Sequence, residues 1–132
     1  MTLRGLLFAA GSAVVGLTLS GCAQPPASAP GLVDLLARPA ERALLGGLRE
    51  YEDARYAEAE HLLTQALNLR LESGKDRAAA HKYLAFIYCT SNRMRDCEAQ
   101  FRAARLADPS FTLSKSEAGH PSWGEVYKRV RP

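Results

Sequence analysis

The stretch that decides the fold is HKYLAFIYCTSNRMRDCEAQFRAARLADP, residues 81–109. Its apolar residues recur at the three- and four-residue spacing of amphipathic helices on both sides of a polar break at residues 91–93. Asn92 lies in this break, and asparagine tolerates the left-handed backbone that a tight turn between helices needs. The stretch closes on Asp108-Pro109, where proline prevents a helix from continuing. We therefore expect a helix hairpin, with its second helix over residues 95–107.

The sequence on either side continues the helical pattern from residue 32 onward, without strand-like alternation. Pro39 suits the first position of a helix, Asp76 is expected to cap another, and Pro121 can start the last. The fold class is therefore all-α. The expected helices cover residues 39–53, 56–71, 76–89, 95–107 and 121–130.

Residues 81–109 also carry a repeat pattern. The positions that define it are His81, Leu84, Ala85, Tyr88, Cys97, Phe101, Ala104 and Pro109. Their order and spacing resembles the tetratricopeptide (TPR) repeat, W-x-x-L-G-x-x-Y followed by A-x-x-x-F and P. Ala85 and Cys97 are small residues in slots where repeat helices approach closely, and only His81, at the tryptophan position, departs outright. The resemblance implies a pair of antiparallel helices that stacks on a neighbouring pair.

An earlier, weaker copy of the pattern runs from residue 51 to residue 67. It consists of Tyr51, Tyr56, Ala57, Ala59, Leu63, Ala66 and Leu67. Ala59 and Cys97 are 38 residues apart, one 34-residue repeat plus four. The surplus falls in the polar stretch 72–76, where insertions are tolerated. We expect two TPR-like helix hairpins, a fragment of an α-solenoid. An unrelated small helical bundle would share the composition but not this spacing.

Two repeats are fewer than the three that a solenoid usually needs, so the exposed ends require covers. Residues 32–36 and the last helix are expected to provide them. One face of that last helix carries Trp123, Val126, Tyr127 and Val130. These side chains are expected to cap the core, although a Trp and a Tyr on one face could also form a binding patch.

The N-terminus has the order of a bacterial lipoprotein signal. A positive start with Arg4 precedes an apolar run over residues 6–19, too short for a permanent membrane span. The run ends in Leu19-Ser20-Gly21-Cys22, which resembles a lipobox. The resemblance implies a signal peptide over residues 1–21, cleavage before Cys22 and acylation of that cysteine. The alternative is an ordinary secretory peptide with a chance cysteine.

Residues 22–31 are proline-rich and uncharged, and we expect them to form an extended tether before a helical domain over residues 32–132. The residue after the cysteine is Ala23. In enteric-type bacteria an aspartate there favours the inner membrane, so its absence favours the periplasmic face of the outer membrane.

Acylation of Cys22 would leave Cys89 and Cys97, an even number for an oxidising compartment. They flank the turn at residues 91–93, and we expect a disulfide between them. Two buried thiols are the alternative, because the repeat asks for alanine at position 97 and ideal repeat geometry does not place the two positions opposite each other.

The chain offers no support for catalysis. His61, His81 and His120 lie on different elements, without the context of a catalytic or zinc motif. Glu50, Glu52 and Asp53 are expected to form a solvated helix end. The formal net charge of +3 is too small to argue for nucleic acid. We expect no enzymatic activity, cofactor, metal or small-molecule substrate.

Repeats of the TPR family bind proteins in the groove formed by the first helix of each pair. On the matched register, that groove would receive Lys82, Phe86 and Cys89 from the second pair, and Arg42, Leu45 and Arg49 from the first. Basic side chains beside an exposed aromatic ring suit an acidic or carboxylate-ended segment. An ordinary mixed surface is the alternative.

The layout of lipobox, short linker, two repeats and the tail at residues 117–124 resembles the small TPR lipoproteins that accompany type VI secretion systems. The resemblance implies an adaptor or assembly factor that binds a cell-envelope protein and is held to the membrane by its lipid. The alternative is a pilotin-like or assembly-machine lipoprotein for a secretin, a pilus or outer-membrane β-barrel insertion. Contact with peptidoglycan is a weaker third possibility, without a recognisable motif.

Overall fold

A computed structural model describes residue 31, residue 34 and residues 37–130. The predicted signal peptide, the lipobox cysteine and nearly all of the tether lie outside these residues, as does most of the expected N-terminal cover at residues 32–36. The described part of the chain is helical and contains no strand. Its helices are α2 (Pro39–Glu52), α3 (Tyr56–Asn68), α4 (Gly74–Thr90), α5 (Met94–Ala107), α6 (Lys115–Ala118) and α7 (Gly124–Arg129).

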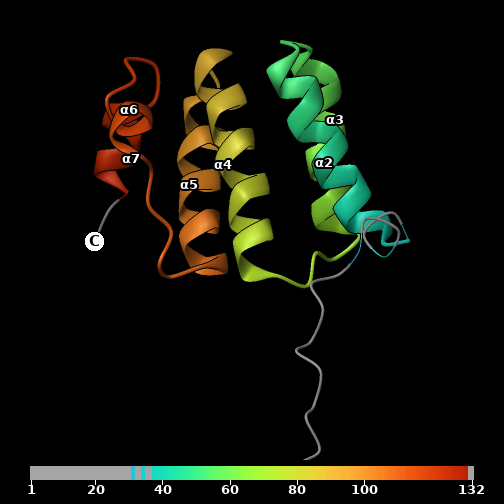
Figure 1. The fold of residues 1–132 in the computed structure, drawn as a ribbon. Coiled ribbons are helices and arrows are strands. Elements are labelled where there is room, and N and C mark those ends of the chain that lie inside the picture. The colour runs from blue at the N-terminus through green and yellow to red at the C-terminus, as the bar shows by residue number, and fades with distance from the viewer. Residues whose placement is uncertain (1–30, 32–33, 35–36, 131–132) are drawn as a thin grey trace, which may run out of the picture.

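The helices form two antiparallel hairpins that stand side by side (Figure 1). Helix α2 packs on α3, α4 packs on α5, and α3 joins the two pairs by packing on α4. The short helices α6 and α7 lie at the far end of the row, where α7 contacts α5. The packed hairpins expected from the sequence are therefore present.

Several expected helix boundaries need correction. Helix α3 ends at Asn68 and not near residue 71. Helix α4 begins two residues before Asp76, because Ser73 is the cap: its Oγ accepts a hydrogen bond from the Asp76 backbone N–H at 3.2 Å. The expected helix over residues 121–130 is shorter, since residues 121–123 form turns and α7 begins only at Gly124. The other short helix, α6, lies in the segment expected to be a loop before residue 121.

The turns after α2, α3 and α4 each contain a residue with a left-handed backbone: Ala54 at φ 60°, Arg70 at φ 62° and Asn92 at φ 63°. The expectation for Asn92 is confirmed. Ala54 and Arg70 adopt the same conformation although their side chains disfavour it, which costs roughly 1–2 kcal/mol per residue. Two of the three turns are therefore strained by their sequence.

Small residues let the helices of each hairpin approach closely. Ala59, Ala85 and Cys97, in the small-residue slots of the repeat pattern, have no exposed surface. A Cβ atom at Gly47 would lie 2.8 Å from Cγ of Leu63, so no larger residue fits where α2 crosses α3. Leu63, together with Phe101, fills the space between the backbones and is fully buried.

The C-terminal segment covers the second hairpin and belongs to the core. Trp123, Val126 and Tyr127 are buried, which confirms the expected cap. The Trp123 Nε1–H donates to the Glu117 carbonyl at 2.8 Å, and the Tyr127 hydroxyl accepts from the Leu113 backbone N–H at 3.1 Å. Both buried rings therefore have partners for their polar atoms, as buried Trp and Tyr usually require. No described helix is long and apolar enough to span a bilayer.

Candidate functional site

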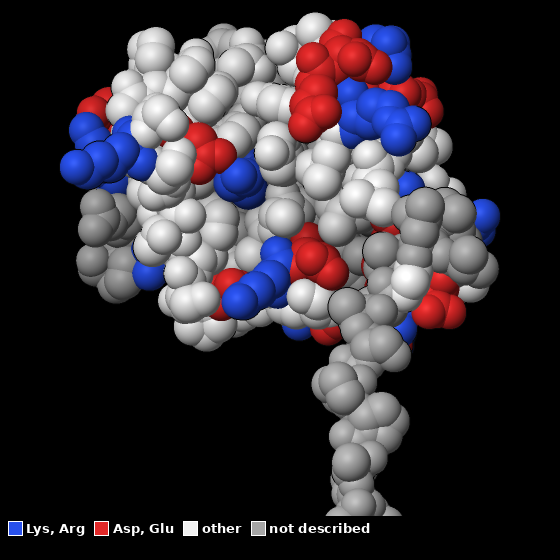
Figure 2. Space-filling view, in the orientation of Figure 1, with Lys and Arg blue, Asp and Glu red and all other residues white. Residues whose placement is uncertain are grey.

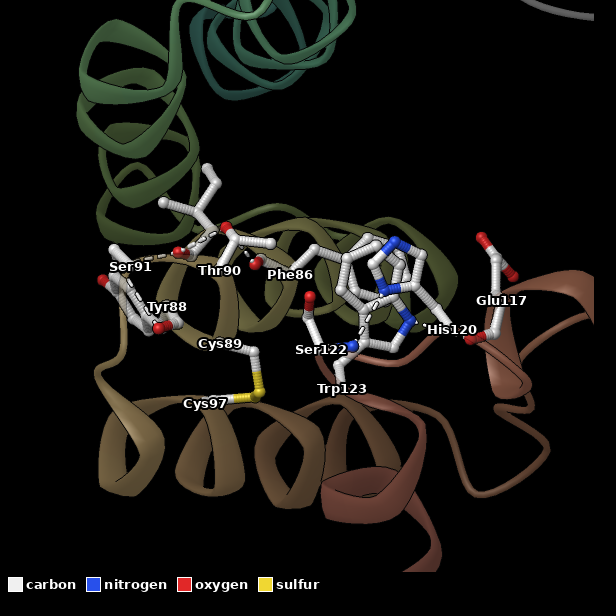
Figure 3. Close-up of a disulfide and its surroundings, with 11 residues drawn as sticks. Phe86, Tyr88, Cys89, Thr90, Ser91, Cys97, Glu117, His120, Ser122 and Trp123 are labelled. Atoms are coloured by element: carbon white, nitrogen blue, oxygen red, sulfur yellow. Dashed lines mark hydrogen bonds between the residues drawn. A yellow bond between two sulfur atoms is a disulfide. The ribbon is translucent and has the colours of Figure 1, made fainter.

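The structure contradicts the expectation that Phe86 is an exposed groove residue. Only 3% of Phe86 is exposed, because the indole of Trp123 stacks on its ring with centroids 4.1 Å apart (Figure 3). Cys89, expected in the same groove, is buried as well. The part of α4 that the repeat register assigned to a partner is thus occupied by the chain's own C-terminal segment.

Lys82 keeps its position on this face, but its charge is already engaged. Its Nζ donates to Glu117 Oε1 at 2.7 Å, and the two side chains are only 18% and 27% exposed. Burial alone would raise the pKa of Glu117, but hydrogen bonds from Lys82 and Ser114 outweigh it and hold this pKa below its usual value. The pair ties α4 to α6 and leaves little free positive charge for an acidic ligand.

Arg42, Leu45 and Arg49 are exposed on one face of α2, as expected. Their spacing places them away from the buried side of that helix, which carries Ala43, Leu44 and Gly47. No hydrogen bond, ion pair or aromatic contact between described residues joins them to Lys82 or Phe86. Of the five predicted groove residues, Phe86 is therefore buried and Lys82 is paired, whereas Arg42, Leu45 and Arg49 stay exposed.

The structure brings together a continuous row of aromatic rings, which we call the aromatic strip. The strip starts at the corner between α2 and α3, crosses α4 and ends on the C-terminal segment. Its members in spatial order are Tyr56, Tyr51, Tyr83, Phe86, Trp123 and His120. Successive ring centroids lie 5.5, 4.8, 5.8, 4.1 and 3.4 Å apart. The first three separations lie in the usual range of favourable aromatic contacts, and the two stacks on Trp123 are closer.

The strip is buried in its middle and accessible at its tyrosine end. Tyr56 is 47% exposed, and Tyr51 and Tyr83 are half-buried. Their three hydroxyl groups form no hydrogen bond with any other residue that the structure describes. Burial of the ring, followed by the charge effects of its neighbours, raises the pKa of Tyr51 to about 12. Like any tyrosine hydroxyl at neutral pH, this phenol is protonated and can donate a hydrogen bond to a ligand.

Several charged side chains near the strip are held in ion pairs. At the tyrosine end, Arg55 binds Glu50 through Nε and Asp53 through Nη2, the latter at 2.8 Å. Further along, Lys82 pairs with Glu117. Figure 2 shows the charged atoms of this face in separate groups of both signs, with uncharged surface between them. The expected solvated acidic end of α2 is thus partly an ion-pair cluster with one negative charge in excess, and the strip disfavours an acidic ligand.

The disulfide lies near the buried middle of the strip, formed by Phe86 and Trp123 (Figure 3). The Sγ atoms of Cys89 and Cys97 are 2.06 Å apart, and their Cα atoms are 5.2 Å apart (Figure 3). The expectation that repeat geometry opposes this bridge is wrong, because the end of α4 and the start of α5 converge at the turn between them. The bridge fixes the part of α4 that carries Phe86.

The three histidines occupy separate environments. His61 is exposed near Glu58, and His120 stacks on Trp123. His81 is half-buried, with Nδ1 2.6 Å from Gln100 Oε1. Burial lowers the pKa of His81 against the opposing effect of the Gln100 hydrogen bond. Within the described residues, no three His, Cys, Asp or Glu side chains are grouped so as to hold a metal ion.

Two surface hollows lie outside the aromatic strip. One, of about 560 Å³, runs along a single face of α3 from Ala57 to Leu69. The other, of about 290 Å³, lies where the start of α2 meets the residues after α3. Neither hollow gathers aromatic rings, so the aromatic strip remains the best-defined candidate site.

Sequence reasoning included Tyr51 and Tyr56 in the repeat pattern but did not assign them, or Tyr83, to a site. It also missed α6, although Ser114 and Glu117 carry the spacing of a capping box. The structure contains this box: the Ser114 Oγ accepts from the Glu117 N–H at 3.2 Å, and Glu117 Oε2 accepts from the Ser114 N–H at 2.9 Å. The box holds Glu117 where it meets Lys82.

Comparison of the chain with protein-family models, curated proteins and solved structures finds no match.

Proposed function

We propose that this protein is a lipid-anchored periplasmic adaptor that binds another cell-envelope protein through the aromatic strip and performs no chemistry. The observation that carries the proposal is the accessible end of the strip. The three tyrosines of this end, Tyr51, Tyr56 and Tyr83, come from two hairpins and share one surface. Their hydroxyl groups form no hydrogen bond with any other described residue. Tyrosine combines a large apolar ring with a polar tip, and it is enriched where proteins bind one another.

We further propose that the hairpins are TPR-like. Their support is the spacing of the repeat pattern together with the complete burial of its small residues Ala59, Ala85 and Cys97. In such repeats the first helix of each pair, here α2 and α4, builds the binding face. This face here is shortened, because the C-terminal segment covers Phe86 and leaves the tyrosine end for a partner.

The proposed setting is the periplasmic face of the outer membrane, beside a type VI secretion system. Its support is the lipobox-like sequence ending at Cys22 and the resemblance of the whole layout to the small TPR lipoproteins of those systems. Anchoring raises the effective concentration of two proteins on the same membrane, so a modest affinity of the strip suffices for function. A secretin, pilus or β-barrel assembly machine remains the alternative setting.

Crosslinking in intact cells followed by purification from native membranes tests the partner. The test variant Tyr56→Ser, Tyr83→Leu removes both accessible edges of the strip while keeping an apolar side chain on α4. The matched control is Leu106→Ser, because Leu106 is 87% exposed on α5 and belongs to no aromatic contact. We expect a defined envelope protein to be recovered with the wild type and the control, and to be depleted with the test variant.

Circular dichroism of all three proteins checks that the fold is retained. Equal recovery of the same partner with a folded Tyr56→Ser, Tyr83→Leu variant would refute the assignment to the strip. Absence of any specific envelope protein from the wild-type sample would refute the adaptor function.

Acyl labelling with membrane fractionation tests the anchor. Cys22→Ser is expected to abolish the label and release the protein from the membrane fraction. A label of equal strength on Cys22→Ser would show that Cys22 is not the lipidated residue.

A further inference from the structure

We infer that the tyrosine end of the aromatic strip binds this chain's own proline-rich tether, residues 23–31, so that the tether is an internal ligand which a partner must displace. The inference rests on the proposed function only in taking the strip as the binding surface. It concerns the regulation of that surface and can be tested on the purified protein without any partner.

The chemistry of the two segments matches. The tether has the sequence AQPPASAPG, with prolines at positions 25, 26 and 30. Such a segment favours the polyproline II conformation, which has no internal hydrogen bonds and leaves its carbonyl groups unpaired. Proline-rich segments dock in grooves lined by aromatic rings. Tyr51 and Tyr56 offer ring surface to the prolines, whereas Lys82 Nζ lies over the ring of Tyr83, 4.7 Å from its centroid. All three tyrosines offer hydroxyl donors to the carbonyls.

The charges are compatible, because the tether carries none and the tyrosine end of the strip has an excess of negative charge that would repel an acidic ligand. Residues 23–31 contain no Asp, Glu, Lys or Arg. Around the strip, Arg55 pairs with both Glu50 and Asp53, which leaves one negative charge in excess, and Lys82 pairs with Glu117. An acidic or basic ligand would have to break these pairs, whereas an uncharged ligand leaves them intact. The strip therefore suits the tether better than the acidic segment expected from the sequence.

The length of the chain permits this contact. Helix α2 starts at Pro39, and Tyr51 lies twelve residues further, about 18 Å along the helix at about 1.5 Å per residue. The chain before Pro39 is not fully extended, because Asp34 is helical and its backbone N–H donates to the Gly31 carbonyl at 2.9 Å. The residues that precede this turn, 23–30, can extend roughly 25 Å at about 3.1 Å per residue. A tether that folds back along α2 therefore reaches the level of Tyr51 with chain to spare.

Intramolecular docking needs little affinity. A short flexible connection gives an effective concentration of the order of millimolar, so a segment with a dissociation constant of the order of 1 mM occupies the site about half of the time. The proline-rich sequence loses little conformational freedom on binding, since it already favours the bound conformation. Docking shortens the distance between lipid and domain, and displacement by a partner restores the full reach.

Paramagnetic nuclear magnetic resonance on the unlipidated mature chain, residues 22–132 with Cys22→Ser, tests the inference. A nitroxide is attached through Ala27→Cys, while the Cys89–Cys97 disulfide keeps the other thiols from reacting. We expect the ring signals of Tyr51, Tyr56 and Tyr83 to lose most of their intensity relative to the reduced, diamagnetic sample. Tyr127, buried on the far side of α5, serves as an internal reference.

Three variants make the result specific. Replacing Pro25, Pro26 and Pro30 by serine changes no residue of α2–α7 and should restore the tyrosine signals. Tyr56→Ser should restore the signals of Tyr51 and Tyr83, because it removes the most exposed ring. The control Leu106→Ser should change nothing. Broadening that persists in the triple proline variant would overturn the inference, since it would then reflect only a nearby flexible chain.

Two further outcomes would also contradict binding of the tether to the strip. Broadening confined to the start of α2 and to residues 69–72 would show that the tether does not reach the strip. Broadening seen only when nitroxide-labelled chains are mixed with isotope-labelled ones would assign the strip to a second copy of the chain. Either outcome leaves the partner pull-down untouched, so failure of this inference and failure of the adaptor function are distinguishable.

Discussion

The rings of Phe86 and Trp123 stack with their centroids 4.1 Å apart and their planes 20° from parallel. Phe86 lies in the middle of α4, and Trp123 directly precedes α7, so the contact joins the second hairpin to the C-terminal segment. Both side chains are buried, and His120 stacks on the outer side of the indole. The C-terminal segment is therefore part of the hydrophobic core and not an appendage to it.

Trp123→Ala is expected to lower the free energy of unfolding by about 3–5 kcal/mol, because it removes a large buried ring and leaves a cavity against Phe86. Urea unfolding followed by circular dichroism measures the loss. Leu106→Ala is the control and should stay within about 0.5 kcal/mol of the wild type, since Leu106 is 87% exposed. A loss below about 1 kcal/mol for Trp123→Ala would contradict the role of the stack.

The pair between Lys82 and Glu117 predicts a loss of stability in acid. The pKa of Glu117 is lower in the folded protein than its usual value of 4.5, since its hydrogen bonds outweigh burial. Its contribution is thus complete above the pKa of the unfolded chain and disappears as the pH falls through the lower pKa of the folded state. Urea midpoints measured at neutral pH and below pH 4.5 should differ less for Glu117→Gln than for the wild type.

Glu58→Gln is a matched control for this experiment, because Glu58 lies on the exposed side of α3 and outside the strip. It should keep the acid sensitivity of the wild type. Identical pH dependence of Glu117→Gln and the wild type would show that the pair contributes nothing to folding.

Reduction of the Cys89–Cys97 disulfide should lower the free energy of unfolding by about 2–3 kcal/mol, the effect expected for a closed loop of this short length. Urea unfolding with and without a reductant measures the difference, and the double variant Cys89→Ala, Cys97→Ala should no longer respond to the reductant. Mass spectrometry of unreduced peptides from periplasmic protein checks the pairing itself. Two free thiols there would show that the bridge does not form in the cell.

Ala54→Gly is expected to raise the free energy of unfolding by about 0.5–1 kcal/mol, because glycine adopts the left-handed backbone at φ 60° without the penalty of a Cβ atom. Ala99→Gly, in the exposed interior of α5, is the control of opposite sign and should lower it by about 1 kcal/mol. Thermal or urea unfolding distinguishes the two. A loss of stability in Ala54→Gly would argue against the left-handed turn.

The sequence by itself determined the helices and much of what they bury. Helical periodicity is a property of residues three and four apart, so the positions of α2, α4 and α5 follow from local sequence to within one or two residues. The same local spacing identified Trp123, Val126 and Tyr127 as one apolar face, and the small residues Ala59, Ala85 and Cys97 as points of close approach. The sequence also contains a signal for the short helix α6, the capping-box spacing of Ser114 and Glu117.

Only the tertiary structure decided which faces meet. The repeat register places Phe86 on the groove face, and it does so whether a partner or the chain's own Trp123 covers the ring. No local spacing distinguishes these two cases. Tyr51 and Tyr83 are 32 residues apart and become neighbours only because two hairpins pack through α3 and α4. Burial and ring contacts of this kind depend on the relative placement of separate helices, which a one-dimensional period does not contain. For that reason the sequence located the domain and its helices, whereas the candidate site emerged only from their packing.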